Sequence, residues 1–273
     1  MPLKFQCVTA VVMSYQGSEI LHSNGDAALP EKFGDTSVTL PTGRKYTSRN
    51  RLPCTDKYQA MSKEQRVLLY VQQNASRGDP DSVLAAVDKF GWETEWAMNV
   101  GDVKGAILDQ FVKETAPQTM LELGTYMGYS AIRTVRLLPE TAKFMTVEFN
   151  EKYAAVAREM IEFAGLQNRI IQISSDTADV IPQLKTKHDV ETLDMVFIDH
   201  RKKFYVRDIK LLETNKLLRK GTVVVADNII KPGAPEYAEY VRTCGKYDST
   251  FHESLLEYSN DDIDGLEKSV FRG

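Results

Sequence analysis

The stretch TMLELGTYMGYS, Thr119 to Ser130, decides the fold. It joins a short apolar strand to a glycine-containing turn and the start of a helix. The same alternation then repeats along the chain, with further apolar runs at KFMTVE, RIIQIS, LDMVFID and TVVVAD. Strands separated by segments of helix length form right-handed βαβ units, and the parallel sheet that results is covered on both faces.

The segments between and after these strands complete the predicted fold. Helices are expected at 129–138, 151–165, 177–186, 204–218 and 234–243, and an antiparallel pair at 249–259 and 266–273. The prediction is an α/β, doubly wound, Rossmann-like fold, whose mostly parallel seven-stranded sheet ends in a C-terminal antiparallel hairpin. Ligands in such folds lie outside the carboxyl ends of the strands.

Two regions precede the sheet. Residues 1–59 are rich in Ser, Thr, Gly, Asn and Pro, and we interpret them as a loosely structured N-terminal extension with one strand near Cys7–Ser14. The predicted domain, 60–273, opens with Ser62 and Gln65, which form a capping-box pattern before an amphipathic helix. Two more helices are expected, at 79–92 and 100–114.

Composition narrows the class of protein. The chain has 273 residues, 42% of them hydrophobic, which is enough for one large domain. Its net charge of −4 argues against a nucleic-acid partner. The run Phe5 to Met13 is too short for a membrane span. Three scattered cysteines match no metal-ligand spacing and favour a reducing, cytoplasmic compartment.

The turn after the first strand of the sheet suggests the kind of nucleotide ligand. Gly124 and Gly128 are present, but Tyr126 replaces the second glycine of a G-x-G-x-x-G fingerprint, which opposes a nicotinamide oxidoreductase. Glu148 ends the second strand, where an acidic side chain can accept both hydroxyls of a ribose. Together they fit a nucleoside without phosphates, such as S-adenosylmethionine. Helix-entry glycines and a solvated glutamate are equally open interpretations.

Two later strands end in carboxylates, Asp199 and Asp227, the latter followed by Asn228. Adjacent strands lie about 4.8 Å apart, so these oxygens can share one Mg²⁺. The alternative is a pair satisfied by backbone N–H groups or arginines. Lys202 lies three residues beyond Asp199, where a cation would lower its pKa towards that of a base. From residue chemistry alone, a solvated basic turn at 201–203 is the simpler interpretation.

At this point the residues resemble a known family, the catechol O-methyltransferases. The resemblance spans residues 62–273 and rests on WAMNVGDVKG, LELGTYMGYSA, VEFN, FAGLQ, IPQL, LDMVFIDHRK, LLRKGTVVVADN, PGAPEY, LEY and DGLEK. It implies a class I methyltransferase fold, S-adenosylmethionine as methyl donor, Mg²⁺, a small-molecule catechol substrate, and a monomer or weak dimer.

The resemblance also implies the site residues. The metal ligands would be Asp199, Asp227 and Asn228, with Lys202 as the base and Glu257 holding the second catechol hydroxyl. The cosubstrate would contact Met98, Val100, Glu122, Gly124, Tyr126, Tyr129, Ser130, Glu148, Phe149, Thr177, Asp199 and His200. The catechol would contact Trp96, Met98, Lys202, Asn228, Pro232, Leu256 and Glu257.

Three departures from the family pattern bear on the substrate. Arg201 stands where the family usually has tryptophan, residues 175–179 replace G-x-S-Q-D, and the spacing from LEY to DGLEK is one residue longer. The guanidinium of Arg201 at the rim of the catechol site would favour acidic catechols over amines. It is equally open that this side chain stacks on the adenine or points to solvent. A methyltransferase for phenylpropanoid (caffeoyl) thioesters and a non-catalytic homologue acting as a binding protein are the alternative functions.

Overall fold

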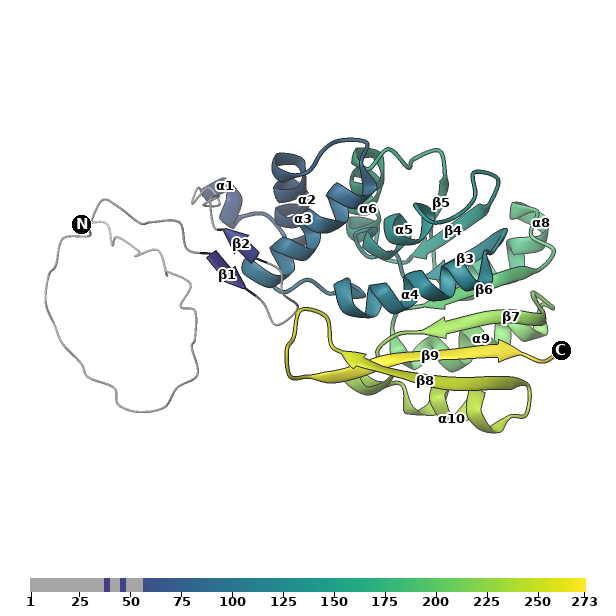
Figure 1. The fold of residues 1–273 in the computed structure, drawn as a ribbon. Coiled ribbons are helices and arrows are strands. Elements are labelled where there is room, and N and C mark those ends of the chain that lie inside the picture. Colours follow the sequence, from purple (N-terminus) through teal and green to yellow (C-terminus); the bar gives the residue numbers. More distant parts are fainter. Residues whose placement is uncertain (1–36, 40–44, 48–55) are drawn as a thin grey trace, which may run out of the picture. The chain divides into compact units, whose positions relative to one another are not determined.

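The computed structural model describes residues 37–39, 45–47 and 56–273, which fall into two compact units, 1–60 and 61–273 (Figure 1). In the first unit, β1 (Ser37–Thr39) pairs antiparallel with β2 (Lys45–Thr47), and α1 (Asp56–Gln59) follows. The strand predicted near Cys7–Ser14 lies outside the described residues, as does most of the predicted extension.

The second unit is built on a seven-stranded sheet with the order β5-β4-β3-β6-β7-β9-β8. Its strands are β3 (Thr119–Leu123), β4 (Lys143–Glu148), β5 (Ile170–Ser174), β6 (Leu193–Ile198), β7 (Leu218–Ala226), β8 (Tyr247–Leu255) and β9 (Ile263–Phe271). The first five are parallel, and β9 pairs antiparallel with both β7 and β8. The predicted fold is therefore confirmed, and β3 and β6 lie side by side where the strand order reverses.

Helices cover both faces of this sheet. Figure 1 shows α4 (Gly101–Thr115), α5 (Tyr129–Val135) and α6 (Glu151–Phe163) in front of it, and α9 (Tyr205–Thr214) and α10 (Pro235–Thr243) behind. The helices α2 (Lys63–Asn74) and α3 (Pro80–Glu93) pack on α6 and α5. Ser62 and Gln65 form the predicted capping box at the start of α2. Since both faces are covered, the strand residues Val224, Val225 and Ala226 are fully buried.

The predicted helix at 177–186 is not continuous, and the one predicted at 204–218 runs too far. Pro182 lacks the N–H that a continuous helix needs, and the first segment divides into α7 (Thr177–Val180), a 3₁₀ turn (Ile181–Gln183) and α8 (Leu184–His188). The helix α9 ends at Thr214 because β7 already begins at Leu218, which pairs with Leu193. The predicted helix at 129–138 likewise ends early, at Val135.

Candidate active site

Gly124 lies where the ends of β3 and β6 approach each other closely. Its φ is +104°, and a Cβ built there would lie 2.3 Å from the carbonyl oxygen of Asp199. The Asp199 N–H donates to the Leu123 carbonyl at 2.8 Å, which ties the end of β6 to the end of β3. The glycine is therefore required by the approach of the Asp199 backbone, and this approach places the Asp199 side chain beside the turn.

A buried carboxyl with spare acceptor capacity lies next to this turn. Glu122 is fully buried in β3; its Oε1 accepts from the Thr146 hydroxyl at 2.7 Å, and its Oε2 has no hydrogen-bond partner among the described residues. Burial raises the pKa of Glu122 to about 8. An ammonium group would satisfy this oxygen and favour the ionised form.

Glu148 holds the neighbouring turn in shape. Its Oε2 accepts from the Tyr126 N–H and its Oε1 from the Asn150 N–H, both at 2.8 Å. Tyr126 has a φ of +48°, and its hydroxyl donates to Glu64 at 2.7 Å. The carboxylate thus fixes the turn that precedes α5, while each oxygen keeps a lone pair for a further donor.

Asp208 in α9 organises the far side of the same edge. The Thr177 hydroxyl donates to Asp208 Oδ2 at 2.6 Å, and His200 Nε2 lies 2.6 Å from the same oxygen. His200 stacks on Tyr205, with ring centroids 5.2 Å apart, and its buried Nδ1 has no hydrogen-bond partner in the described part of the chain. The ring is therefore held rigidly, with one nitrogen left to meet a ligand.

The predicted base and two predicted metal ligands converge on one point. Lys202 Nζ donates to Asp199 Oδ1 at 3.1 Å, to Asn228 Oδ1 at 2.8 Å and to the Tyr205 hydroxyl at 2.7 Å. The oxygens of Asp199 and Asn228 already surround a cation, and oxygen is the donor that Mg²⁺ prefers. The donor set fits that metal. Among the described residues, no group of three or more His, Cys, Asp and Glu side chains could by itself hold a metal ion.

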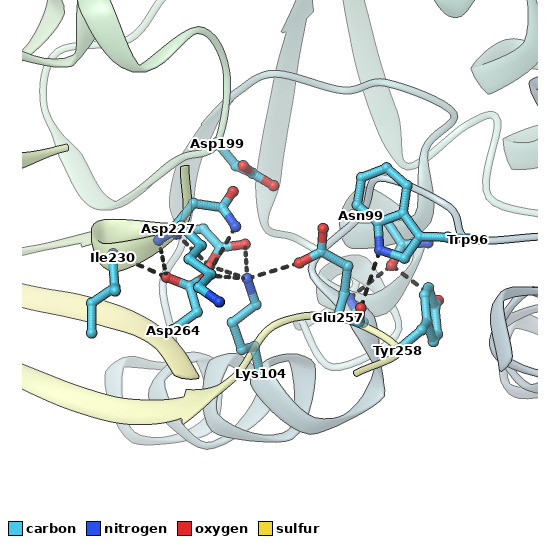
Figure 2. A network of polar contacts seen from close by, with 12 residues as sticks. Trp96, Asn99, Lys104, Asp199, Asp227, Ile230, Glu257, Tyr258 and Asp264 are labelled. Carbon is cyan, nitrogen blue, oxygen red and sulfur yellow. Dashed lines mark hydrogen bonds and ion pairs between the residues drawn. The ribbon is translucent and has the colours of Figure 1, made fainter. Parts of the chain in front are cut away.

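Asp227 meets a lysine that the sequence interpretation did not identify. Lys104 Nζ, from α4, lies 2.8 Å from Asp227 Oδ1, 2.8 Å from Asp264 Oδ2 and 3.1 Å from Glu257 Oε2 (Figure 2). Burial opposes the charged form of Lys104, but the three carboxylates outweigh it and raise its pKa above the usual range. Burial also raises the pKa of Asp227 to about 7, which Lys104 only partly offsets.

Asp264, in β9, orients Asn228, one of the predicted metal ligands. Its Oδ2 accepts from Asn228 Nδ2 at 2.9 Å, and its Oδ1 accepts from the N–H groups of Ile230 and Lys231. Because the amide nitrogen is fixed on Asp264, the Asn228 oxygen points toward Lys202 and Asp199. Such outer contacts orient metal ligands in proteins.

Comparison with known proteins gives the family. A family model described as O-methyltransferase matches residues 74–241. Catechol O-methyltransferase from Bos taurus is 52% identical over 212 residues, which cover 78% of each chain. The chain belongs to the O-methyltransferase family. The Transmembrane O-methyltransferase of Homo sapiens is 37% identical over 211 residues, 77% of this chain and 72% of that one. The O-methyltransferase TomG from Streptomyces achromogenes, solved with SAM, shares the fold with a TM-score of 0.61 and 22% identity, covering 78% of this chain and all of that one.

The loop after β8 completes the site of this O-methyltransferase. Glu257 lies near Lys104, and its backbone carbonyl accepts from Trp96 Nε1 at 3.2 Å. The hydroxyl of the next residue, Tyr258, lies 3.0 Å from both Asp88 Oδ1 and Asn99 Oδ1 and can donate its proton to either, which anchors the loop on α3 and the segment before α4. The position of Glu257 is therefore fixed from both sides.

The remaining predicted residues differ in how far they are buried. Val100 is buried before α4, Tyr129 and Ser130 are buried at the start of α5, and Leu256 is partly buried in the β8–β9 loop. Trp96, Met98 and Phe149 are exposed, and Pro232 follows a cis peptide bond in the loop after β7. The Tyr129 hydroxyl donates to Asp88, and so belongs to the network that anchors Tyr258. Arg201 is exposed beside Lys202.

Two residues of this site, Lys104 and Asp264, were missed. Lys104 carried a signal: it occupies the buried face of α4 with Gly101, Gly105 and Leu108, at helical spacing. A lysine on the buried face of a helix requires a buried partner of opposite charge. The sequence pattern did not say which carboxylates those partners are.

Proposed function

We propose that this O-methyltransferase transfers the methyl group of S-adenosylmethionine to one hydroxyl of a catechol, with Mg²⁺ held by Asp199, Asp227 and Asn228. The observation that supports this most directly is the convergence of Lys202 on the oxygens of Asp199 and Asn228. A base and a set of oxygen ligands thus lie together at the carboxyl edge of the sheet, where this fold binds its substrates.

In this proposal each side chain has one task. Lys202 accepts, at Nζ, the proton of the hydroxyl that is methylated. Glu257 accepts a hydrogen bond from the other hydroxyl and so fixes the orientation of the ring. When bound, Mg²⁺ would supply positive charge that lowers the pKa of a catechol hydroxyl. Holding the oxygen in line with the methyl group contributes the larger part of the acceleration, since correct orientation is worth roughly 7–11 kcal/mol.

The methyl donor is placed by the other half of the site. The unpartnered Oε2 of Glu122 fits the ammonium group of the methionine part, and Glu148 fits the ribose hydroxyls. We also propose a reducing compartment such as the cytoplasm, supported by the odd number of cysteines, of which Cys244 is a free thiol. No helix of the described residues is both long and apolar enough to cross a membrane.

The test is transfer of labelled methyl from S-adenosylmethionine to a panel of catechols and a caffeoyl thioester. We expect labelled catechols, loss of the product with a chelator, and recovery with added Mg²⁺. Lys202→Ala should reduce kcat far more than it changes the KM for S-adenosylmethionine. The exposed neighbour Lys203→Ala is the matched control and should retain turnover. Label only on the thioester, no label at all, or full turnover in Lys202→Ala would contradict the proposal.

A further inference from the structure

Lys104 is a fully buried cation that the proposed reaction does not use. Its side chain and that of Asp264 are completely buried, and those of Asp227 and Glu257 are 1% and 4% exposed. A buried ammonium needs compensating charge, and three carboxylates within 3.1 Å supply it. Lys104 is therefore held in place as a permanent positive charge.

The three carboxylates do not lie on the same side of the lysine. Figure 2 shows Asp227 and Glu257 on opposite sides of the ammonium, and so Lys104 connects a proposed metal ligand to the proposed acceptor of the second hydroxyl. The start of α4 supports this arrangement, because a Cβ at Gly101 would lie 2.8 Å from Glu257 Cβ. Helix and loop are thus in direct contact where the ion pair forms.

The charge of Lys104 acts directly on one of the proposed metal ligands. Its ammonium lies 2.8 Å from Asp227 and 3.1 Å from Glu257. Replacing it with a neutral side chain makes this cluster more negative, and so increases its attraction for a divalent cation.

Resting on the function proposed above, we infer that Lys104 is a positioning residue of the catechol site. Its ammonium holds the Glu257 carboxylate toward the substrate and weakens the attraction of Asp227 for the metal. A cation next to a carboxylate lowers its basicity, and so makes it a poorer metal ligand. Lys104 therefore lowers metal affinity while it raises turnover.

Loss of Lys104 should strengthen metal binding but reduce turnover. General damage to the site would weaken both, so the two explanations can be distinguished. In Lys104→Met, Mn²⁺ titrated into the protein and followed by electron paramagnetic resonance should bind at least about tenfold more tightly. The same variant should have a higher KM for catechol and a lower kcat, with little change in the KM for S-adenosylmethionine. Loosening of the site would weaken Mn²⁺ binding, and weaker or unchanged binding would overturn the inference.

A double variant keeps the test decisive if Lys104→Met does not fold. Lys104→Met/Glu257→Gln removes one charge of each sign, and is compared with Glu257→Gln alone. We expect tighter Mn²⁺ binding than in Glu257→Gln, and the same catechol turnover, because Lys104 acts on the substrate through Glu257. A further loss of turnover in the double variant would refute that route.

The matched control is Arg242→Met. Arg242 pairs with Glu267, another fully buried carboxylate, but lies in α10 and contacts none of the site residues named above. It should lower the melting temperature and leave Mn²⁺ affinity and the KM for catechol unchanged. If wild-type protein neither binds Mn²⁺ nor methylates catechols, the proposed function fails. If it does both and the Lys104 variants behave like Arg242→Met, only the present inference fails.

Discussion

Replacing Glu122 with glutamine should stabilise the ligand-free protein at alkaline pH and weaken S-adenosylmethionine binding. Burial raises the pKa of this carboxyl to about 8, so that folding favours its protonated form. The stability that this provides is complete below the unfolded pKa of 4.5 and is lost as the pH rises through 8. Glutamine resembles the protonated acid and keeps the acceptor for Thr146.

The size of the effect follows from the shift. At about 1.4 kcal/mol per pH unit, the wild type loses on the order of 3 kcal/mol by pH 7 and on the order of 5 kcal/mol by pH 9, relative to pH 4. The glutamine variant should not show this loss. The difference in unfolding free energy between the two proteins should therefore grow in favour of Glu122→Gln between pH 5 and pH 9, which urea unfolding at several pH values measures.

Ligand binding gives an independent measure of the same carboxyl. At pH 7 Glu122 is mainly protonated, and pairing with the ammonium of S-adenosylmethionine should release close to one proton. Calorimetry in two buffers of different ionisation enthalpy counts that proton. Glu122→Gln should release none and bind the ligand roughly a hundredfold more weakly, as expected when a buried charged pair is lost. Equal proton release by both proteins, or a stability difference independent of pH, would refute the reasoning.

Three further changes test other parts of the structure. Burial raises the pKa of Asp88 to about 6, so the wild type should lose about 3 kcal/mol of unfolding free energy between pH 4 and pH 7 that Asp88→Asn does not lose. A difference in unfolding free energy that urea unfolding finds to be the same at pH 4 and pH 7 would contradict this. Gly124→Ala should unfold at a clearly lower temperature than Gly221→Ala, since both have positive φ but only Gly124 faces a backbone oxygen, that of Asp199. Arg201→Trp should lower the ratio of kcat/KM for 3,4-dihydroxybenzoate over dopamine, and an unchanged ratio would remove Arg201 as the source of preference.

The sequence predicted the sheet well because the apolar runs and the lengths of the segments between them can be recognised locally in the sequence. Each apolar run of five to seven residues became a strand, and the alternation with helices set the parallel order. Helix ends were predicted less well. The helix expected to reach Leu218 ends at Thr214, since the residues beyond it pair with β6, and only the folded sheet reveals that partner.

The residues of the candidate site also differ in how far the local sequence predicts them. Asp199, Asp227 and Asn228 could be predicted from the sequence because the end of a strand is visible there, and the fold brings strand ends to one edge. Thr177 was predicted as a cosubstrate contact, and in the structure its hydroxyl donates to Asp208. The partner of this hydroxyl is a side chain of α9, distant in the sequence, and no local pattern around Thr177 predicts that contact.

Lys104 shows what a closer interpretation of the sequence could have added. The sequence shows Asp227 at the end of an apolar strand, and Mg²⁺ was the predicted partner of this carboxylate, with backbone N–H groups or arginines as the alternative. The structure supplies a lysine at 2.8 Å instead, and leaves the metal as a proposal. Both fit the same carboxylate, because its two oxygens can accept more than one partner. A charged residue on the buried face of a helix and a carboxylate at the end of a buried strand each lack a partner when the sequence is considered alone. Considered together, they predict their own contact.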